Sequence, residues 1–152
     1  MKNQDEQTLD VSPLREDEFD AWLPLATGYM SFYKTSRQPD EYRQLWRRLH
    51  GGAGLHAFGA RLGGQLVGFT HHFFHASCWG ADVCYLQDLF VAPSARGMGV
   101  GRTLIERVSE QARRAGAPRL YWLTHSSNEV ARGLYDQVAT HSGFIRYEIN
   151  MG

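Results

Sequence analysis

Hydrophobic positions near the start of the chain follow a helical period. Apolar side chains fall three or four positions apart from Phe19 to Ala26, which predicts a helix over residues 13–33. The segment 39–50, "PDEYRQLWRRLH", begins with proline and acidic residues and ends with basic ones before "GGAG". These are the signals of a helix start and a helix stop, so a second helix is predicted there.

The middle of the chain changes to the pattern of strands. Residues 56–62 and 66–75 are predicted to form a hairpin, because Gly63 and Gly64 supply the positive φ angles of a tight turn. Residues 82–92, "DVCYLQDLFVA", are almost continuously apolar. Such a run is typical of a central strand that is buried on both faces.

The remaining elements alternate between helix and strand. A helix is predicted over residues 103–116, a strand over 119–125, an extended helix over 126–141 and a last strand over 143–149. The order of strands and helices, after two N-terminal helices and a hairpin, predicts an α/β fold with a mixed sheet.

Composition limits the classes of protein that fit this pattern. The chain has 152 residues, so one domain over residues 1–152 is expected, with 1–10 as a flexible or edge segment. Sixteen basic residues balance sixteen acidic ones, which argues against nucleic acid or a membrane surface as partner. The polar start, the two cysteines and the lack of an apolar run near roughly 18 residues favour a cytoplasmic protein.

The stretch "RGMGVGR", Arg96 to Arg102, precedes a predicted helix. Glycines at a helix N-terminus let backbone N–H groups approach an anion closely. The spacing of Gly97, Gly99 and Gly101 fits neither the P-loop nor the dinucleotide fingerprint, which disfavours a nucleotide-binding α/β protein. The alternative to an anion site is a glycine-rich turn that is needed only for tight packing.

Two motifs lie in order along the chain: Arg96–Gly101 matches [Q/R]-x-x-G-x-[G/A], and "NEVARGLY" matches N-x-x-A-x-x-x-Y. Through these motifs the sequence resembles the GCN5-related N-acetyltransferase (GNAT) family, in its histone and polyamine acetyltransferase branch. The resemblance is strong from Phe69 to Tyr147. It implies a mixed, mostly antiparallel sheet flanked by helices, in which two splayed parallel central strands form a wedge for acetyl-CoA.

The resemblance also implies which residues hold acetyl-CoA as cosubstrate, without a metal. Strand backbone would pair with the pantetheine amides, and one strand N–H would hold the thioester carbonyl, at Leu89, Phe90 and Val91. The pyrophosphate would lie against Arg96 and the backbone of Gly97, Met98, Gly99, Val100, Gly101 and Arg102. Asn128 would touch the CoA arm.

Tyr135 ends the second motif and is the candidate general acid. Its phenol has an ordinary pKa near 10, so it is protonated at neutral pH and can donate to the departing thiolate of CoA. Tyr135 is also expected to line the cofactor site. The base is left open between Asp88, His71 and His125. Asp88 is the tentative base or acceptor contact, and Gln87 stands where polyamine-acetylating relatives tend to carry a second acid.

The function implied is transfer of an acetyl group to a primary amine through a tetrahedral intermediate, with a small amine as the acceptor. The alternatives are a protein-lysine acetyltransferase similar to the histone enzymes and a non-catalytic acyl-CoA sensor. The expected partners are acetyl-CoA and the amine, and assembly as a homodimer is left open.

Overall fold

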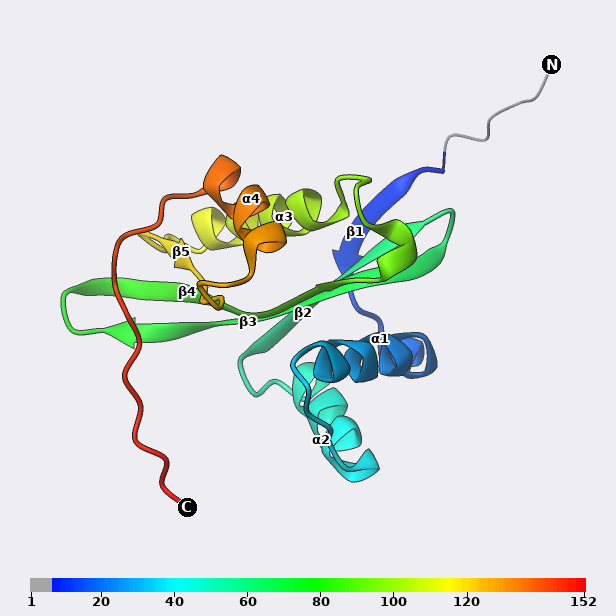
Figure 1. The fold of residues 1–152 in the computed structure, drawn as a ribbon. Coiled ribbons are helices and arrows are strands. Elements are labelled where there is room, and N and C mark those ends of the chain that lie inside the picture. Colours follow the sequence, from blue (N-terminus) through cyan, green and yellow to red (C-terminus); the bar gives the residue numbers. More distant parts are fainter. Residues whose placement is uncertain (1–6) are drawn as a thin grey trace. The chain divides into compact units, whose positions relative to one another are not determined.

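The computed structural model describes residues 7–152, which fall into two compact units divided after Trp122. Within these residues the first unit contains a sheet and three α-helices, and the second, Leu123–Gly152, contains one α-helix (Figure 1). The expectation of one domain over residues 1–152 stays a prediction. No helix in the described part of the chain is long and apolar enough to cross a membrane.

The first unit is built on a five-stranded sheet in which spatial order follows chain order. The first four strands pair antiparallel, and β4 pairs with β5 in parallel, so the predicted mixed and mostly antiparallel sheet is confirmed. The elements of the unit are β1 (Leu9–Pro13), the 3₁₀ turn η1 (Glu16–Glu18), α1 (Phe19–Phe32), α2 (Pro39–His50), β2 (Leu55–Leu62), β3 (Gln65–Ser77), β4 (Gly80–Val91), the 3₁₀ turn η2 (Pro93–Ala95), α3 (Val100–Arg114) and β5 (Leu120–Tyr121).

Helices cover both faces of this sheet, with α1 and α2 on one face and α3 on the other (Figure 1). On the α3 side, a Cβ atom at Gly68 would lie 2.9 Å from the Phe90 carbonyl oxygen and 3.3 Å from Leu104, so glycine lets the helix approach. The apolar stripe of α3 is buried and consists of Val100, Leu104, Ile105, Val108 and Ala112. The core on the α1 and α2 side consists of Leu14, Trp22, Ala26, Tyr42, Trp46, Leu66, Phe69 and Phe90.

A β-bulge in β4 decides which face its second half presents. His72 pairs with Leu86 and His71 pairs with Asp88, so Gln87 is an extra residue without an opposite partner on β3. Strand side chains alternate between faces, and one extra residue reverses the alternation. The bulge therefore turns Asp88 to the face of His71, away from the face that Leu86 shares with His72.

Local signals predicted some elements closely and others less well. Helix α2 and the hairpin lie where they are expected. The predicted helix over 13–33 begins only at Phe19, after the separate turn η1, because residues 9–13 form the edge strand β1. Helix α3 begins three residues earlier than predicted, inside the glycine motif. The strand predicted over 119–125 is reduced to Leu120–Tyr121.

The second unit corrects two expectations. Its helix α4 (Glu129–Val138) is shorter than predicted, because Ala139 adopts extended backbone with φ −149°. The predicted strand over 143–149 is wrong, because residues 139–152 carry no regular structure. A strand needs a neighbour for its backbone hydrogen bonds, and the second unit contains none.

Candidate functional site

The N-terminus of α3 presents open backbone. Gly97 and Gly99 both have φ +79°, a left-handed conformation that L side chains rarely adopt. Gly99 is the N-cap of α3 and provides no side-chain cap for the first turn. A Cβ atom at either glycine would meet nothing within 4 Å, so the space beside these two glycines is open. This arrangement suits an anion such as a phosphate group.

Arg96 anchors the start of this loop to the end of β4. Its Nε atom donates a hydrogen bond to the Val91 carbonyl at 3.2 Å, and its guanidinium lies 5.8 Å from the ring centroid of Phe90. The side chain remains exposed. A positive charge therefore stands beside the open glycine backbone, as the sequence predicts for a phosphate site.

The second half of β4 has a free edge. Strand β5 pairs with β4 only at Cys84 and Tyr85, so Leu89, Phe90 and Val91 have no β5 partner in the described chain. The same three residues pair on their other side with β3. Their remaining backbone groups can accept a ligand that carries amides, in the way that a sheet edge accepts another strand.

Asp88 lies next to this free edge in a buried polar cluster. Its Oδ2 atom is 2.9 Å from Nδ1 of His71, and the side chains are 19% and 9% exposed. The other ring nitrogen of His71, Nε2, lies 3.2 Å from Nε1 of the fully buried Trp22. Three elements thus contribute side chains to the cluster: α1, β3 and β4.

Tyr29 completes the cluster from α1. Its phenol lies close enough to Asp88 and Tyr33 to interact with both. Burial and then the nearby Asp88 charge raise the pKa of Tyr29 above its ordinary range, so the hydroxyl stays protonated.

His72 follows His71 in sequence and faces the opposite side of the sheet. Its Nε2 atom lies 2.6 Å from Oε1 of Gln111 on α3, and its ring stacks on His56 at 5.3 Å. Burial lowers the pKa of His72 to about 4, so its imidazole is neutral at neutral pH. His72 therefore belongs to the core on the α3 side and not to the cluster around Asp88.

The remaining predicted residues lie in the second unit. Asn128 is the N-cap of α4, where its Oδ1 accepts from the Ala131 amide at 3.5 Å and its Nδ2 donates to Thr124 at 3.3 Å. Tyr135 lies on the same helix and is partly buried. His125 precedes the helix and is exposed. Of the three candidate bases, only His71 and Asp88 are brought together by the first unit.

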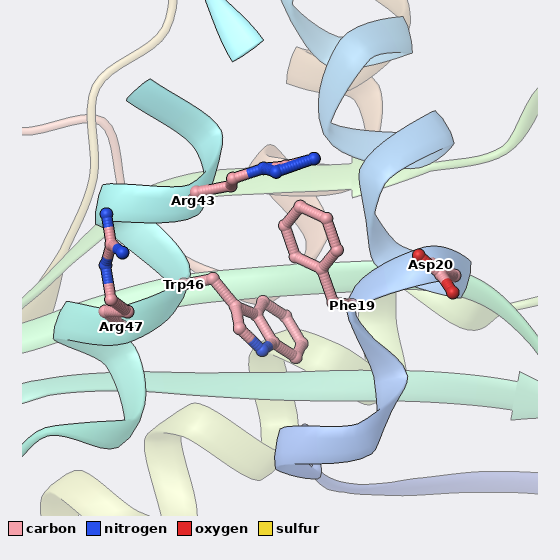
Figure 2. Close-up of a pocket in the computed structure, with 5 residues that line it drawn as sticks. All are labelled: Phe19, Asp20, Arg43, Trp46 and Arg47. Carbon is pink, nitrogen blue, oxygen red and sulfur yellow. The ribbon is translucent and has the colours of Figure 1, made fainter. Parts of the chain in front are cut away.

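One pocket of about 340 Å³ lies outside the predicted site. It is lined by Phe19, Asp20, Arg43, Trp46 and Arg47, where α1 faces α2 (Figure 2). The Arg43 guanidinium lies 5.9 Å from the ring centroid of Phe19. None of the residues that the motifs select lines this pocket, so the candidate site rests on β4 and the α3 N-terminus.

The sequence placed Trp22 in the helical pattern from Phe19 to Ala26 and did not reveal its contact with His71. Trp22 and Tyr29 are seven residues apart, which puts them on one face of α1. The indole N–H and the phenol O–H are polar groups on an otherwise apolar helix face. They were the signal for such a contact, because a buried indole or phenol usually has a hydrogen-bond partner. The partner itself could not be read from the sequence.

Similarity to known proteins agrees with this geometry. A model of the acetyltransferase (GNAT) family matches residues 17–139. The D-amino-acid N-acetyltransferase HPA3 of Saccharomyces cerevisiae is 33% identical over 145 residues, which cover 92% of this chain and 89% of the yeast protein. The thialysine N-epsilon-acetyltransferase of Caenorhabditis elegans is 34% identical over 84 residues, which cover 55% of this chain and 52% of that protein.

A solved structure extends the likeness to the whole chain. The aminoglycoside N-acetyltransferase AAC(6')-Iy in complex with CoA superposes with a TM-score of 0.86 at 17% identity, covering 99% of this chain and 100% of that chain. At this identity the likeness concerns the fold alone.

The mixed sheet, with an open β4 edge beside a glycine-lined helix N-terminus, defines the class as an α/β protein with an anion-accepting helix end. With the family match over residues 17–139, the chain belongs to the GNAT family. It is an acetyltransferase, as the sequence motifs predict.

Proposed function

We propose that the protein transfers the acetyl group of acetyl-CoA to the primary amine of a small acceptor by direct attack. The observation that carries the acceptor assignment is Asp88, a partly buried carboxylate beside the free edge of β4. A carboxylate in that position attracts an ammonium group, and limited exposure reduces screening by water.

Acetyl-CoA is the donor that the chain's backbone suits. The pantetheine amides pair with the free edge at Leu89, Phe90 and Val91. The pyrophosphate is held by Arg96 and by the first-turn N–H groups of α3. The open space in front of Gly97 and Gly99 supports this, since a side chain at either position would stand in the way. Asn128 contributes to holding the CoA arm.

The reaction needs two proton transfers. The acceptor ammonium loses a proton to Asp88 or to a water beside it, and the free amine attacks the thioester carbonyl. One strand N–H among Leu89, Phe90 and Val91 stabilises the oxyanion of the tetrahedral intermediate. The intermediate then collapses to the amide, and the CoA thiolate leaves and takes the Tyr135 phenol proton.

The acceptor carries one or two amines and not a long chain of them. Gln87 is exposed at the bulge and is neutral. Asp88 is therefore the negatively charged residue in the second half of β4, residues 86–91. The chain as a whole has a net charge of +0, which provides little field for a polycation. The similarity to a D-amino-acid and a thialysine acetyltransferase supports an amino acid or a related small amine as the acceptor.

An acceptor panel tests this function. We expect turnover of acetyl-CoA with single amino acids and short diamines, and lower kcat/KM with spermine. Asp88→Asn keeps the size of the side chain and removes its charge, so kcat/KM for the amine should fall by roughly 10- to 150-fold, as for loss of one charge-assisted hydrogen bond. The KM of acetyl-CoA should stay unchanged.

The other outcomes of the panel distinguish the alternatives. A preference for spermine that Asp88→Asn abolishes would restore a polyamine acceptor. Turnover confined to histone-like peptides would identify a protein-lysine acetyltransferase. Tight acetyl-CoA binding without turnover on any acceptor would identify an acyl-CoA sensor.

A further inference from the structure

The hydrogen-bond chain from Trp22 through His71 to Asp88 has a fixed direction. An indole N–H can only donate a hydrogen bond. Nε1 of Trp22 lies 3.2 Å from Nε2 of His71 in a fully buried position, so Nε2 must be the acceptor and carries no proton. A neutral imidazole has one N–H, and this leaves it on Nδ1.

The Nδ1 proton of His71 points at Asp88. The distance from Nδ1 to Oδ2 is 2.9 Å, which is a normal length for a hydrogen bond from a nitrogen to a carboxylate oxygen. The hydrogen bond from the Trp22 indole therefore fixes the tautomer of His71, although the indole does not touch Asp88. His71 is 7% exposed, so water offers little competition for either ring nitrogen.

The His71 N–H is the donor that orients Asp88. It donates from β3, and the Tyr29 phenol on α1 stays protonated near the same carboxylate. A carboxylate has about four lone-pair sites, so the His71 hydrogen bond leaves capacity for a ligand donor. The side chain of Asp88 is 19% exposed, which leaves a way in for a ligand donor.

We propose that His71 is a positioning residue, fixed by Trp22 as the neutral Nδ1–H tautomer so that Asp88 is oriented and keeps its negative charge for the acceptor ammonium group. This inference rests on the proposed function for the identity of the acceptor. It assigns to His71 a role distinct from that of the general base, because Nε2 is occupied by the indole and Nδ1 already carries its proton.

The neutral state of His71 matters for the charge of the site. A doubly protonated His71 would form an ion pair with Asp88 and cancel the charge that attracts an ammonium group. The phenols of Tyr29, on α1, and of Tyr33, the residue that follows α1, also interact within this cluster, and both are uncharged when protonated. Trp22 thus preserves one unit of negative charge at the acceptor site.

The tautomer can be measured on the wild-type protein without any substrate. ¹⁵N NMR on histidine-labelled protein separates protonated from bare ring nitrogens, and comparison with His71→Asn identifies the His71 signals among the seven histidines. We expect Nδ1 protonated and Nε2 bare. A proton on Nε2, whether in the other tautomer or in the imidazolium, would overturn the inference.

The positioning role is tested by a matched pair of variants. His71→Asn retains an N–H at the δ position toward Asp88, whereas His71→Leu has nearly the same shape without a donor. Both leave the Trp22 indole equally unpaired, so the loss of stability that comes from the indole is shared. We expect kcat/KM for the amine to be about 3- to 10-fold lower in His71→Leu than in His71→Asn, with the acetyl-CoA KM equal in both. Equal kcat/KM in the two variants would overturn the role.

Calorimetric titration of the amine into the CoA-bound protein separates this inference from the proposed function. If the two variants bind the amine with the expected difference but wild type acetylates nothing, the function fails and the positioning role holds. If wild type acetylates amines and the variants bind them equally, the positioning role fails and the function holds.

Discussion

Tyr135 is the residue on which the proton balance of the proposed reaction depends. Tyr135→Phe keeps the ring and removes the phenol proton, so packing on α4 is nearly unchanged. Since general acid catalysis contributes roughly 10²–10⁴-fold, we expect kcat to fall within that range. Single-turnover rates with acetyl-CoA and a good amine acceptor measure the chemical step directly.

The affinity for acetyl-CoA is the control for this variant. It should be the same in wild type and Tyr135→Phe, because the hydroxyl acts on the departing thiolate and not on the bound donor. A single-turnover rate within a factor of two of wild type would remove Tyr135 from the mechanism.

At the same scale, Asp88 and His71 show what the sequence could not reveal. They are 17 residues apart, and each was a candidate base for its own reasons. Their contact depends on the β3–β4 register and on the extra residue Gln87, which a period-two pattern cannot locate within a continuously apolar strand. The sequence singles out Asp88 as a candidate, but its partners depend on tertiary structure.

At the scale of elements, locally determined features were predicted best. Helix α2 has its own start and stop signals, and it spans the predicted residues 39–50. The β2–β3 turn is set by Gly63 and Gly64, whose φ angles of +55° and +84° need no tertiary partner. Strands β1 and β5 were missed or overextended, because their limits depend on which backbone lies beside them.

The N-terminus of α3 supplies a prediction at this scale. Gly99→Asp and Gly99→Asn introduce side chains of equal size, and both residues suit an N-cap and tolerate positive φ better than most. Only aspartate adds a negative charge where the pyrophosphate is expected. Calorimetry should therefore give a CoA affinity about tenfold weaker for Gly99→Asp than for Gly99→Asn.

Equal CoA affinities for the two Gly99 variants would contradict the phosphate assignment at α3. Thermal unfolding of both proteins serves as the control. Similar midpoints would show that the difference in affinity comes from charge and not from a loosened helix.

At the scale of the whole molecule, the C-terminal segment of the second unit carries a row of apolar side chains. Ile145, Tyr147, Ile149 and Met151 alternate with polar residues, and 75–92% of each is exposed. This alternation is the pattern of a strand with one apolar face, which is why the sequence predicted a strand there. Among the described residues the segment has no strand partner, so the pattern is present and the pairing is absent.

We expect the missing partner to be a second copy of the chain, so that the protein is a homodimer in solution. Exposed apolar strands tend to pair with another chain, and doing so would bury the alternating face on both sides. Light scattering after size exclusion should give twice the monomer mass of 17.3 kDa for wild type. Ile145→Lys combined with Ile149→Lys should give the monomer, because each lysine puts a charge on the face to be buried. Asn150→Lys, on the polar face, is the matched control and should remain dimeric. A monomeric wild-type protein at micromolar concentration would rule out the dimer, and a dimer that survives both lysines would place its interface elsewhere.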